Sequence, residues 1–310
     1  MNIAEHFNPK KSLKLIGLEK NFIFFKKLLL SKKFPKVSLF TGDQGIGKNT
    51  LINHLMYFYF NKSNYNDEEY HFENKIFIKK YLDKLIPNMI YLDGNNSKST
   101  KIDEIRNLKE LLLKSNLDNL KRFVILDNVE KINTNSLNAL LKLIEEPGEN
   151  NNFILINNKT SSLIDTIKSR CIEFKIIINQ ITRDKIIKFL MDYHKQMNVF
   201  ESNFISVSPG NFLKFNYIFE KNKINTNDEY LSILNKLINL FKKEKENIYR
   251  DLVIYFTEYH FKKISLKRSY DLENVSKKRS LVLTNINDFF LYNLNQNTLL
   301  NSLESKFINE

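Results

Sequence analysis

Short runs of consecutive apolar residues alternate with helical patterns through the first half of the chain. The apolar runs predict five strands: Val37–Thr41, Met89–Leu92, Phe123–Leu126, Phe153–Ile156 and Ile172–Ile177. Apolar residues recur at the spacing of one helix face in three stretches between them: Gly47–Phe60, Lys101–Leu113 and Asn135–Ile144. Strands separated by helices predict a mostly parallel sheet with helices on both faces. The fold class is therefore α/β, in the order of a nucleotide-binding domain.

After Ile178 the strand pattern ends and helical spacing continues to the end of the chain. The predicted helices are Thr182–Tyr193, Phe212–Lys221, Tyr230–Glu246, Ile248–Phe261 and Leu281–Leu294. The polar segment NKINTND at 222–228 separates the second of these helices from the third. We predict three domains: an α/β domain at 1–178, a small helical domain at 179–225 and a larger helical domain at 226–310.

Composition limits the class of protein without identifying it. Of the 310 residues, 42% are hydrophobic, which is enough for a buried core, yet no run approaches the roughly 18 apolar residues of a membrane span. The first residues lack the apolar segment of a signal peptide. We expect a cytoplasmic protein with no membrane partner. The one cysteine, Cys171, excludes an internal disulfide and a cysteine-based zinc cluster, and a buried structural thiol is its expected role.

The chain is basic, with 48 Lys and Arg against 35 Asp and Glu, a formal charge of +13. Clustered cations bind nucleic-acid phosphates by releasing counterions. The abundance of Lys and Asn, with only seven glycines, is also typical of an AT-rich genome, in which Lys replaces Arg everywhere. The charge therefore leaves DNA binding and a solvated surface as equal alternatives.

The stretch VSLFTGDQGIGKNT at 37–50 reads as a strand, a glycine loop and the start of a helix. Gly42, Gly45 and Gly47 let backbone N–H groups point into one anion-sized cradle, and Lys48 would reach the outer phosphates. The spacing matches the phosphate-loop pattern G-x-x-x-x-G-K in full. The sequence therefore predicts a nucleotide-binding loop.

The residue after this lysine is Asn49, where the pattern has the Ser or Thr whose hydroxyl ligates Mg²⁺. An amide oxygen is differently placed, so we expect phosphate binding to survive and metal placement to be lost. Thr50 does not replace the hydroxyl, because one residue along a helix rotates the side chain by about 100°.

A second acidic motif follows the buried strand RFVILD. Asp127 ends that strand, where a carboxylate can hold Mg²⁺ through water; a turn or helix cap is the structural alternative. Hydrolysing proteins of this type usually carry a glutamate next, but here the residue is Asn128, whose neutral amide cannot act as a general base. Glu130, two residues on, need not face the same way.

Three further strings complete a family resemblance: NSLNALLKLIEEP at 135–147, FILINN at 153–158 and LIDTIKSRCIEF at 163–174. Together with IGLEKNF at 16–22 and KIDEIRNLKELL at 101–112, they resemble the clamp-loader branch of the AAA+ ATPases. The triplet Ser169-Arg170-Cys171 closely resembles the motif of bacterial DNA polymerase III clamp-loader subunits. These motifs cover residues 9–175; the remainder fits only as a helical lid followed by a helical collar for oligomerisation.

The resemblance implies a subunit of a hetero-pentameric ring that uses ATP with Mg²⁺ to open the sliding clamp and load it at primer–template DNA. Its partners would be the motor and clamp-opening subunits, the clamp and the DNA. Arg170 would be offered in trans to the neighbour's nucleotide as an arginine finger, with an intramolecular salt bridge as the structural alternative. Polymerase activity would belong to the assembly, because this chain has no set of metal-binding carboxylates beyond Asp127.

The departures from the family pattern bear on activity. The four cysteines of the motor subunits' zinc module are missing, so no zinc is expected. Asn211 stands where a sensor arginine is expected in the lid, while Asn157 or Asn158 can still hydrogen-bond a phosphate or water at the other sensor position. Together with Asn49 and Asn128, Asn211 predicts a stator-like subunit. Such a subunit binds its partners and at most binds ATP, but hydrolyses little of it. The alternatives are a self-sufficient AAA+ ATPase that remodels DNA or protein, and a small-molecule P-loop kinase.

Overall fold

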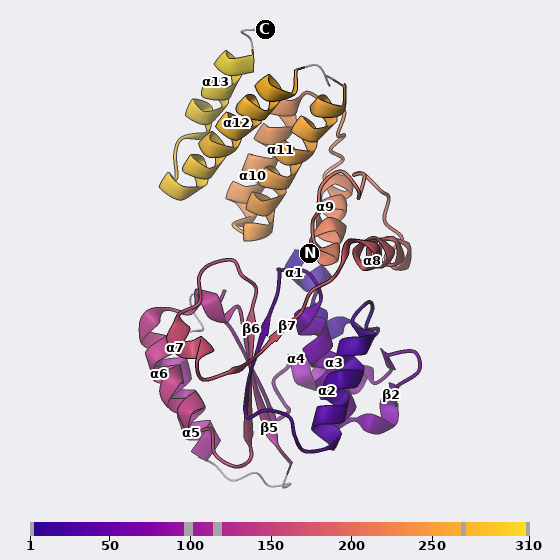
Figure 1. Ribbon diagram of the computed structural model, residues 1–310, viewed down its shortest axis with the longest axis vertical. Helices are drawn as coiled ribbons and strands as arrows, with labels where there is room; N and C mark the ends of the chain where they lie inside the picture. Colours follow the sequence, from indigo (N-terminus) through magenta and orange to yellow (C-terminus); the bar gives the residue numbers. More distant parts are fainter. Residues whose placement is uncertain (1–2, 96–101, 114–119, 268–270, 308–310) are drawn as a thin grey trace. The chain divides into compact units, whose positions relative to one another are not determined.

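The computed structural model describes residues 3–95, 102–113, 120–267 and 271–307. The chain divides into two compact units, Met1–Ile186 and Ile187–Glu310, and the division falls within helix α8 (Gln180–Tyr193) (Figure 1).

The first unit is built on a five-stranded parallel sheet. Its strands lie in the order β4 (Met89–Asp93), β5 (Arg122–Asp127), β6 (Asn151–Asn157), β1 (Val37–Thr41) and β7 (Ile172–Lys175). Every strand was predicted, and the ends agree to within two residues. The parallel sheet confirms the α/β class.

Helices cover both faces of this sheet (Figure 1). One face carries α2 (Glu19–Leu30), α3 (Lys48–Phe60) and α4 (Lys75–Leu82), and the other carries α5 (Ile102–Leu113), α6 (Thr134–Glu145) and the short α7 (Asp165–Lys168). Side chains alternate along β5, so that Phe123 and Ile125 enter the core under α2 and α3. Val124 and Leu126 enter the core under α5 and α6. Burial on both faces explains the unbroken apolar run of β5 in the sequence.

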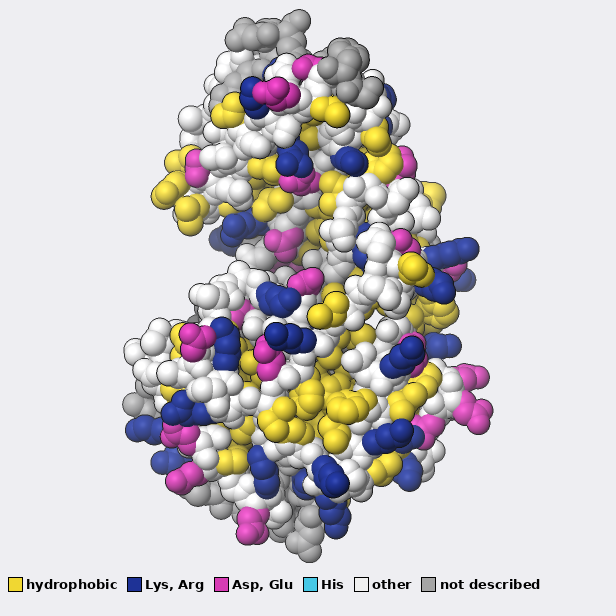
Figure 2. All heavy atoms as spheres, in the orientation of Figure 1, with side chains coloured by type: hydrophobic (Ala, Val, Ile, Leu, Met, Phe, Trp, Pro, Cys, Tyr) yellow, Lys and Arg dark blue, Asp and Glu magenta, His cyan; other side chains and the backbone are white. Residues whose placement is uncertain are grey.

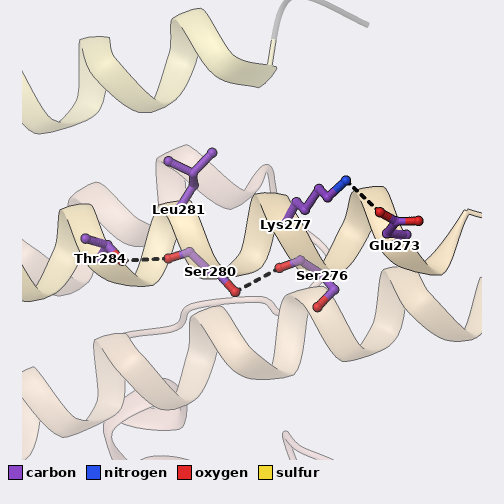
Figure 3. A pocket seen from close by; sticks show the side chains of 6 residues that line it. All are labelled: Glu273, Ser276, Lys277, Ser280, Leu281 and Thr284. Atoms are coloured by element: carbon purple, nitrogen blue, oxygen red, sulfur yellow. Dashed lines mark hydrogen bonds and ion pairs between the residues drawn. The ribbon is translucent and has the colours of Figure 1, made fainter.

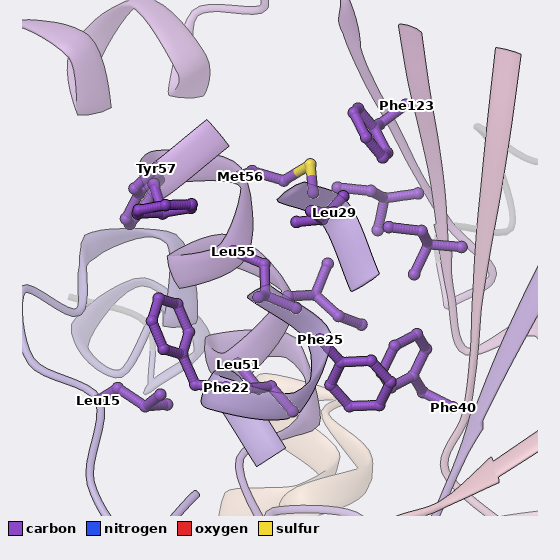
Figure 4. Close-up of a cluster of buried hydrophobic side chains, with 14 of the residues drawn as sticks. Leu15, Phe22, Phe25, Leu29, Phe40, Leu51, Leu55, Met56, Tyr57 and Phe123 are labelled. Atoms are coloured by element: carbon purple, nitrogen blue, oxygen red, sulfur yellow. The ribbon is translucent and has the colours of Figure 1, made fainter. Parts of the chain in front are cut away.

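The core beneath α2 and α3 is rich in aromatic side chains (Figure 4). Phe25 from α2 meets Phe40 from β1, with ring centroids 4.8 Å apart. The same core extends to small elements that the sequence pattern did not predict, namely the hairpin of β2 (Tyr65–Asn66) and β3 (His71–Phe72) and helix α4. The pattern also did not predict α1 (Ile3–His6) and the 3-10 helices Pro9–Lys11 and Lys62–Asn64. A further 3-10 turn, Val129–Lys131, follows β5.

Parallel strands bring their carboxyl ends to one edge of the sheet, where ligands bind in folds of this type. Asp93 at the end of β4 is in register with Asp127 at the end of β5. Thr41 at the end of β1 is in register with Asn157 at the end of β6. The sheet thus places the glycine loop and the second acidic motif at the same edge.

The second unit is helical. Its elements after α8 are α9 (Pro209–Lys221), α10 (Tyr230–Glu244), α11 (Asn247–Lys267), α12 (Leu272–Tyr292) and α13 (Gln296–Phe307). Phe215 on α9 packs against Tyr255 on α11, with ring centroids 4.9 Å apart, and Phe219 packs against Phe256 at 5.7 Å. The proposed lid helix α9 and the proposed collar helix α11 therefore share one aromatic core. The division into three domains stays a prediction.

On the surface of the first unit, hydrophobic side chains gather on the face shown in Figure 2. Ile23 and Phe24 of α2 are 40% and 51% exposed, and Ile172 of the edge strand β7 is 56% exposed. Phe24 also contacts Phe174 of β7, so apolar surface runs from the helix onto the strand. We call Ile23, Phe24, Ile172 and Phe174 the α2–β7 patch.

Among the described helices, none combines the length and apolarity needed to cross a membrane.

Candidate functional site

The glycine loop joins β1 to α3 and has the backbone of a phosphate cradle. Gly42 lies so close to the residue after β7 that a Cβ there would come within 2.5 Å of the carbonyl oxygen of Ile176. Gly45 and Gly47 have φ angles of +88° and +98°, which side chains disfavour. Gly47 is the residue before α3, so the loop presents its N–H groups together with the helix N-terminus.

Lys48 is the first residue of α3, and only 2% of it is exposed. Its ammonium group donates to the backbone oxygens of Gly42 at 2.6 Å and Asp43 at 2.9 Å, which holds it across the loop. Burial lowers the pKa of Lys48 to about 8, against the opposing effect of Asp127, Glu130 and Asp43. A ligand phosphate would restore the charge that burial disfavours, so the lysine is suited to an anion.

Asp127 is 9% exposed, and both of its carboxylate oxygens are occupied by hydrogen-bond donors. Oδ2 accepts from the side-chain amide of Asn49 at 2.5 Å and from the hydroxyl of Tyr91 at 2.8 Å. Oδ1 accepts from the backbone N–H of Asn128 at 2.8 Å and from the side-chain amide of Asn158 at 3.1 Å. Burial and the neighbouring Asp93 raise the pKa of Asp127, while bonds from Tyr91, Asn49 and Asn128 oppose the rise.

A chain of hydrogen bonds fixes the orientation of the Asn49 amide. Its Oδ1 accepts from Nδ2 of Asn53, one helical turn later, at 2.7 Å, and Oδ1 of Asn53 accepts from the hydroxyl of Tyr81 at 3.0 Å. Burial raises the pKa of Tyr81 well above its ordinary value, so its hydroxyl remains a donor. The Asn49 NH₂ group must therefore face Asp127, because a carboxylate only accepts.

The Mg²⁺ that the family resemblance implies does not fit these residues. Asn49 presents donors to Asp127 where a metal site needs an oxygen ligand, and both oxygens of the aspartate are engaged. Within the described residues, no group of three or more His, Cys, Asp or Glu could hold a metal ion. The structure brings Asn49 and Asp127, both of which are predicted site residues, next to each other. They are joined by a direct hydrogen bond.

The residues after Asp127 are held in structural contacts. Asn128 has a left-handed φ of +52°, and its amide donates to Asp93 at 2.8 Å and accepts from Asn158 at 2.9 Å. Glu130 is 7% exposed and accepts from the backbone N–H of Asn158 and from the hydroxyl of Thr160, the latter at 2.7 Å. Glu130 therefore ties down the loop after β6.

The remaining predicted positions lie as follows. The Asn157 side chain accepts from the backbone N–H of Lys159 at 2.9 Å, within its own turn, so Asn158 is the amide that reaches Asp127. Thr50 is half-buried in the first turn of α3. Asn211 lies in the first turn of α9, in the second unit.

Lys10 is a site residue that the sequence patterns did not indicate. Its ammonium group lies 3.3 Å from the centroid of the Tyr91 ring, a cation–π contact, and its backbone oxygen accepts a hydrogen bond from the Tyr57 hydroxyl. Burial and the charge of Lys84 lower the pKa of Lys10 to about 8, and Asp127 among others opposes this. The N-terminal segment thus brings a second, half-buried lysine to the acidic motif.

Arg170 lies after α7, with 37% of its side chain exposed. Its Nε donates to Oε1 of Glu145 at 2.6 Å, and Nη1 donates to the backbone oxygen of Thr166 at 2.9 Å. The intramolecular salt bridge, which was the structural alternative to a role in trans, is therefore present, and it leaves Nη2 of the guanidinium without a hydrogen bond among the described residues. Cys171, the next residue, is half-buried, and burial raises the pKa of its thiol to about 12, which opposes a reactive thiolate.

A separate shallow pocket lies along α12 in the second unit (Figure 3). It is lined by Glu273, Ser276, Lys277, Ser280, Leu281 and Thr284. Two of its hydroxyls donate back to their own helix: Ser280 to the Ser276 oxygen at 3.0 Å and Thr284 to the Ser280 oxygen at 3.0 Å. Glu273 pairs with Lys277 at 2.6 Å. This pocket contains none of the predicted site residues and offers no comparable chemistry.

Comparison with known proteins agrees with the motifs. A family model described as "DNA polymerase III, delta subunit" matches residues 17–179. The chain is 37% identical over 81 residues to a DNA polymerase III subunit delta' of Buchnera aphidicola (subspecies Baizongia pistaciae), covering 26% of this chain and 24% of that protein. It is 31% identical over 189 residues to a subunit gamma from another Buchnera, covering 61% of this chain and 50% of that protein. The chain thus spans at most half the length of these two relatives.

Among solved structures, a DNA polymerase III gamma subunit-related protein from Thermotoga maritima aligns with 91% of this chain and 96% of its own. The sequence identity is 18% and the TM-score is 0.48.

Proposed function

The chain belongs to the DNA polymerase III delta subunit family, and we propose that it works as a clamp-loader subunit of the delta prime type. In this role it takes part in ATP-dependent loading of the sliding clamp during DNA replication. It binds neighbouring subunits and a nucleotide, hydrolyses little or no ATP itself, and offers Arg170 to the nucleotide of a neighbour.

The observation that carries this proposal is the state of Asp127. The loop before α3 keeps the form of a phosphate site, but Asn49, Tyr91, Asn128 and Asn158 fill the hydrogen-bonding capacity of the aspartate. The usual catalytic glutamate is replaced by an asparagine that cannot accept a proton from water. Binding without efficient hydrolysis follows from this combination.

Arg170 supports the part of the proposal that concerns a neighbour. Two of its nitrogens are held by Glu145 and Thr166, while the guanidinium remains partly exposed and its outer edge faces no recorded partner within the described residues. A guanidinium so held loses little conformational freedom when it meets a phosphate. An arginine supplied in trans stabilises the charge that develops on a transferring phosphoryl group.

The proposed partners are the motor and clamp-opening subunits of a hetero-pentamer, the sliding clamp and primer–template DNA, in the cytoplasm. Exposed apolar surface such as the α2–β7 patch is typical of surfaces that pack against another protein. The proposed collar, from residue 226 onward, is the part assigned to ring assembly. The basic charge of the chain is compatible with DNA nearby, without a specific reader of bases.

Reconstitution tests the proposal. The purified chain is assayed for ATP turnover alone, and then the motor and clamp-opening subunits of the same organism are assayed with and without it. We expect negligible turnover by the chain alone and at least a tenfold rise in the DNA-dependent ATPase rate when it completes the assembly. Turnover by the isolated chain that disappears in Lys48→Ala would instead favour the self-sufficient AAA+ ATPase.

A further inference from the structure

We propose that the phosphate loop of this chain binds the phosphates of ATP or ADP without a divalent cation, with Asn49 and Lys10 standing in for the metal. This inference deepens the proposed function and rests on the part of it that assigns nucleotide binding to the loop. It does not depend on Arg170 acting on a neighbour's nucleotide. The bound nucleotide is then a stable ligand, not a substrate.

The distance between the side chains of Asn49 and Asp127 is too short for a metal ion to lie between them. Mg²⁺ holds oxygen ligands at about 2.0–2.1 Å in an octahedral arrangement, so two of its ligand atoms lie about 2.9 Å apart when adjacent and about 4 Å apart when opposite. In this chain, Nδ2 of Asn49 and Oδ2 of Asp127 are 2.5 Å apart and joined by a hydrogen bond. No ion fits between them, and the atom of Asn49 that faces the aspartate is a donor.

The second argument is that the amide is locked in place. To turn its side-chain oxygen toward a metal, Asn49 would have to break the hydrogen bonds that it donates to Asp127 and Tyr91. It would also lose the hydrogen bond that it accepts from Asn53. The bond from Tyr81 to Asn53 depends on the same orientation. Buried polar groups left without partners cost free energy, so the whole chain of bonds resists the change.

The third argument concerns charge. A metal ion normally balances the acidic motif and the phosphates, and here Lys10 brings a cation close enough to interact with Asp127 and Asp93. Its ammonium group sits 3.3 Å from the centroid of Tyr91, whose hydroxyl donates to Asp127 at 2.8 Å. Asn8 caps the 3-10 helix that carries Lys10, and the Tyr57 hydroxyl binds its backbone oxygen, so the lysine is tethered in position.

Together with Lys48, the site therefore holds two ammonium groups, one buried and one half-buried, against the buried carboxylates of Asp127 and Glu130. The two cations offset these two carboxylates without a metal ion. The site does not suit hydrolysis, because Asn128, which stands where the catalytic base is usual, cannot accept a proton from water.

The test is isothermal titration of the full chain with ATP and with ADP, once in EDTA and once in excess Mg²⁺. We expect binding in EDTA at an affinity equal to that in Mg²⁺ within about twofold, or tighter. Affinity at least tenfold weaker in EDTA would overturn the inference, and so would the absence of binding in both buffers. None of these outcomes requires a variant to fold.

Variants identify the groups. Lys10→Met should weaken binding in EDTA at least fivefold, while Lys11→Met, on the same 3-10 helix, should leave it unchanged. Asn49→Thr removes the amide and supplies the hydroxyl of the usual pattern, so binding should become at least fivefold tighter with Mg²⁺ than in EDTA. If Lys10→Met and Lys11→Met changed the affinity in EDTA equally, the role given to Lys10 would be contradicted. If Mg²⁺ changed the affinity of Asn49→Thr no more than that of the natural chain, the role given to Asn49 would be contradicted.

The two proposals fail separately. Loss of metal-free binding with intact stimulation of the motor subunits would overturn this inference alone. Metal-free binding without stimulation of the motor subunits would overturn the clamp-loader role and leave the site as described.

Discussion

Glu145 at the end of α6 accepts a hydrogen bond from Nε of Arg170 at 2.6 Å, and this ion pair orients the exposed guanidinium. Exposed ion pairs contribute less than about 1 kcal/mol to stability, so the pair matters for position more than for folding. We expect Glu145→Gln to lower the ATPase rate of the reconstituted assembly several-fold and to leave the free energy of unfolding of the chain nearly unchanged.

Glu146→Gln is the matched control for that experiment. It makes the same change of charge one residue later, at an exposed position, and should leave the ATPase rate as it was. A Glu145→Gln assembly that is as active as the control, or more active, would show that the ion pair does not orient Arg170 for the neighbour.

Tyr91 links the acidic motif to Lys10, and its hydroxyl both donates to Asp127 and accepts from Asn49. Tyr91→Phe keeps the ring beneath Lys10 but leaves buried polar groups short of a partner. We expect the free energy of unfolding to fall by about 1–3 kcal/mol, measured by urea denaturation. Tyr59→Phe removes a hydroxyl from a ring of the same core and should cost much less; equal losses for the two variants would contradict the account of Asp127.

His54 makes the first unit sensitive to acid. It is fully buried between the Tyr65 hydroxyl and the backbone oxygen of Ser12, and burial lowers its pKa from 6.5 to about 3. Between these pH values the unfolded chain binds more protons than the folded one, so stability falls as the pH falls. This group alone should cost about 3 kcal/mol of unfolding free energy between pH 6.5 and pH 4.

The measurement is urea denaturation at pH 7 and at pH 4. His54→Gln should lower stability at pH 7 and lose less on acidification than the natural chain does. His6→Gln replaces an exposed histidine and should follow the natural chain at both pH values. A His54→Gln variant with the full pH dependence would show that the buried imidazole is not its source.

The sheet and the phosphate loop could be predicted from the sequence because their signals are local. Strands buried on both faces are mostly apolar, and the run from Val37 to Thr41 has the bounds that the structure gives it. The two-residue strands β2 and β3 are too short to carry an alternating pattern. Helix α12 begins at Leu272 rather than at Leu281, because its polar first turns are supported by the Glu273–Lys277 pair.

The chemistry of the site could be predicted only in part. Asn49 and Asn128 were visible as departures from a motif, but their partners come from distant segments. The hydrogen bond of Asn49 to Asp127 spans 78 positions, and Lys10 reaches Tyr91 from the N-terminal segment. The spacing of Asn49 and Asn53 by one helical turn was the local signal that could have indicated a chain of amides on one face of α3.

The central claim is that this chain serves a neighbour's nucleotide through Arg170, and the most direct measurement is the steady-state ATPase rate of the reconstituted assembly carrying Arg170→Ala. The variant should assemble normally, as judged by size-exclusion chromatography, and lose at least tenfold in rate; Lys168→Ala, at an exposed cation on α7, should retain the full rate. An Arg170→Ala assembly that hydrolyses ATP at the rate of the natural one would contradict the account.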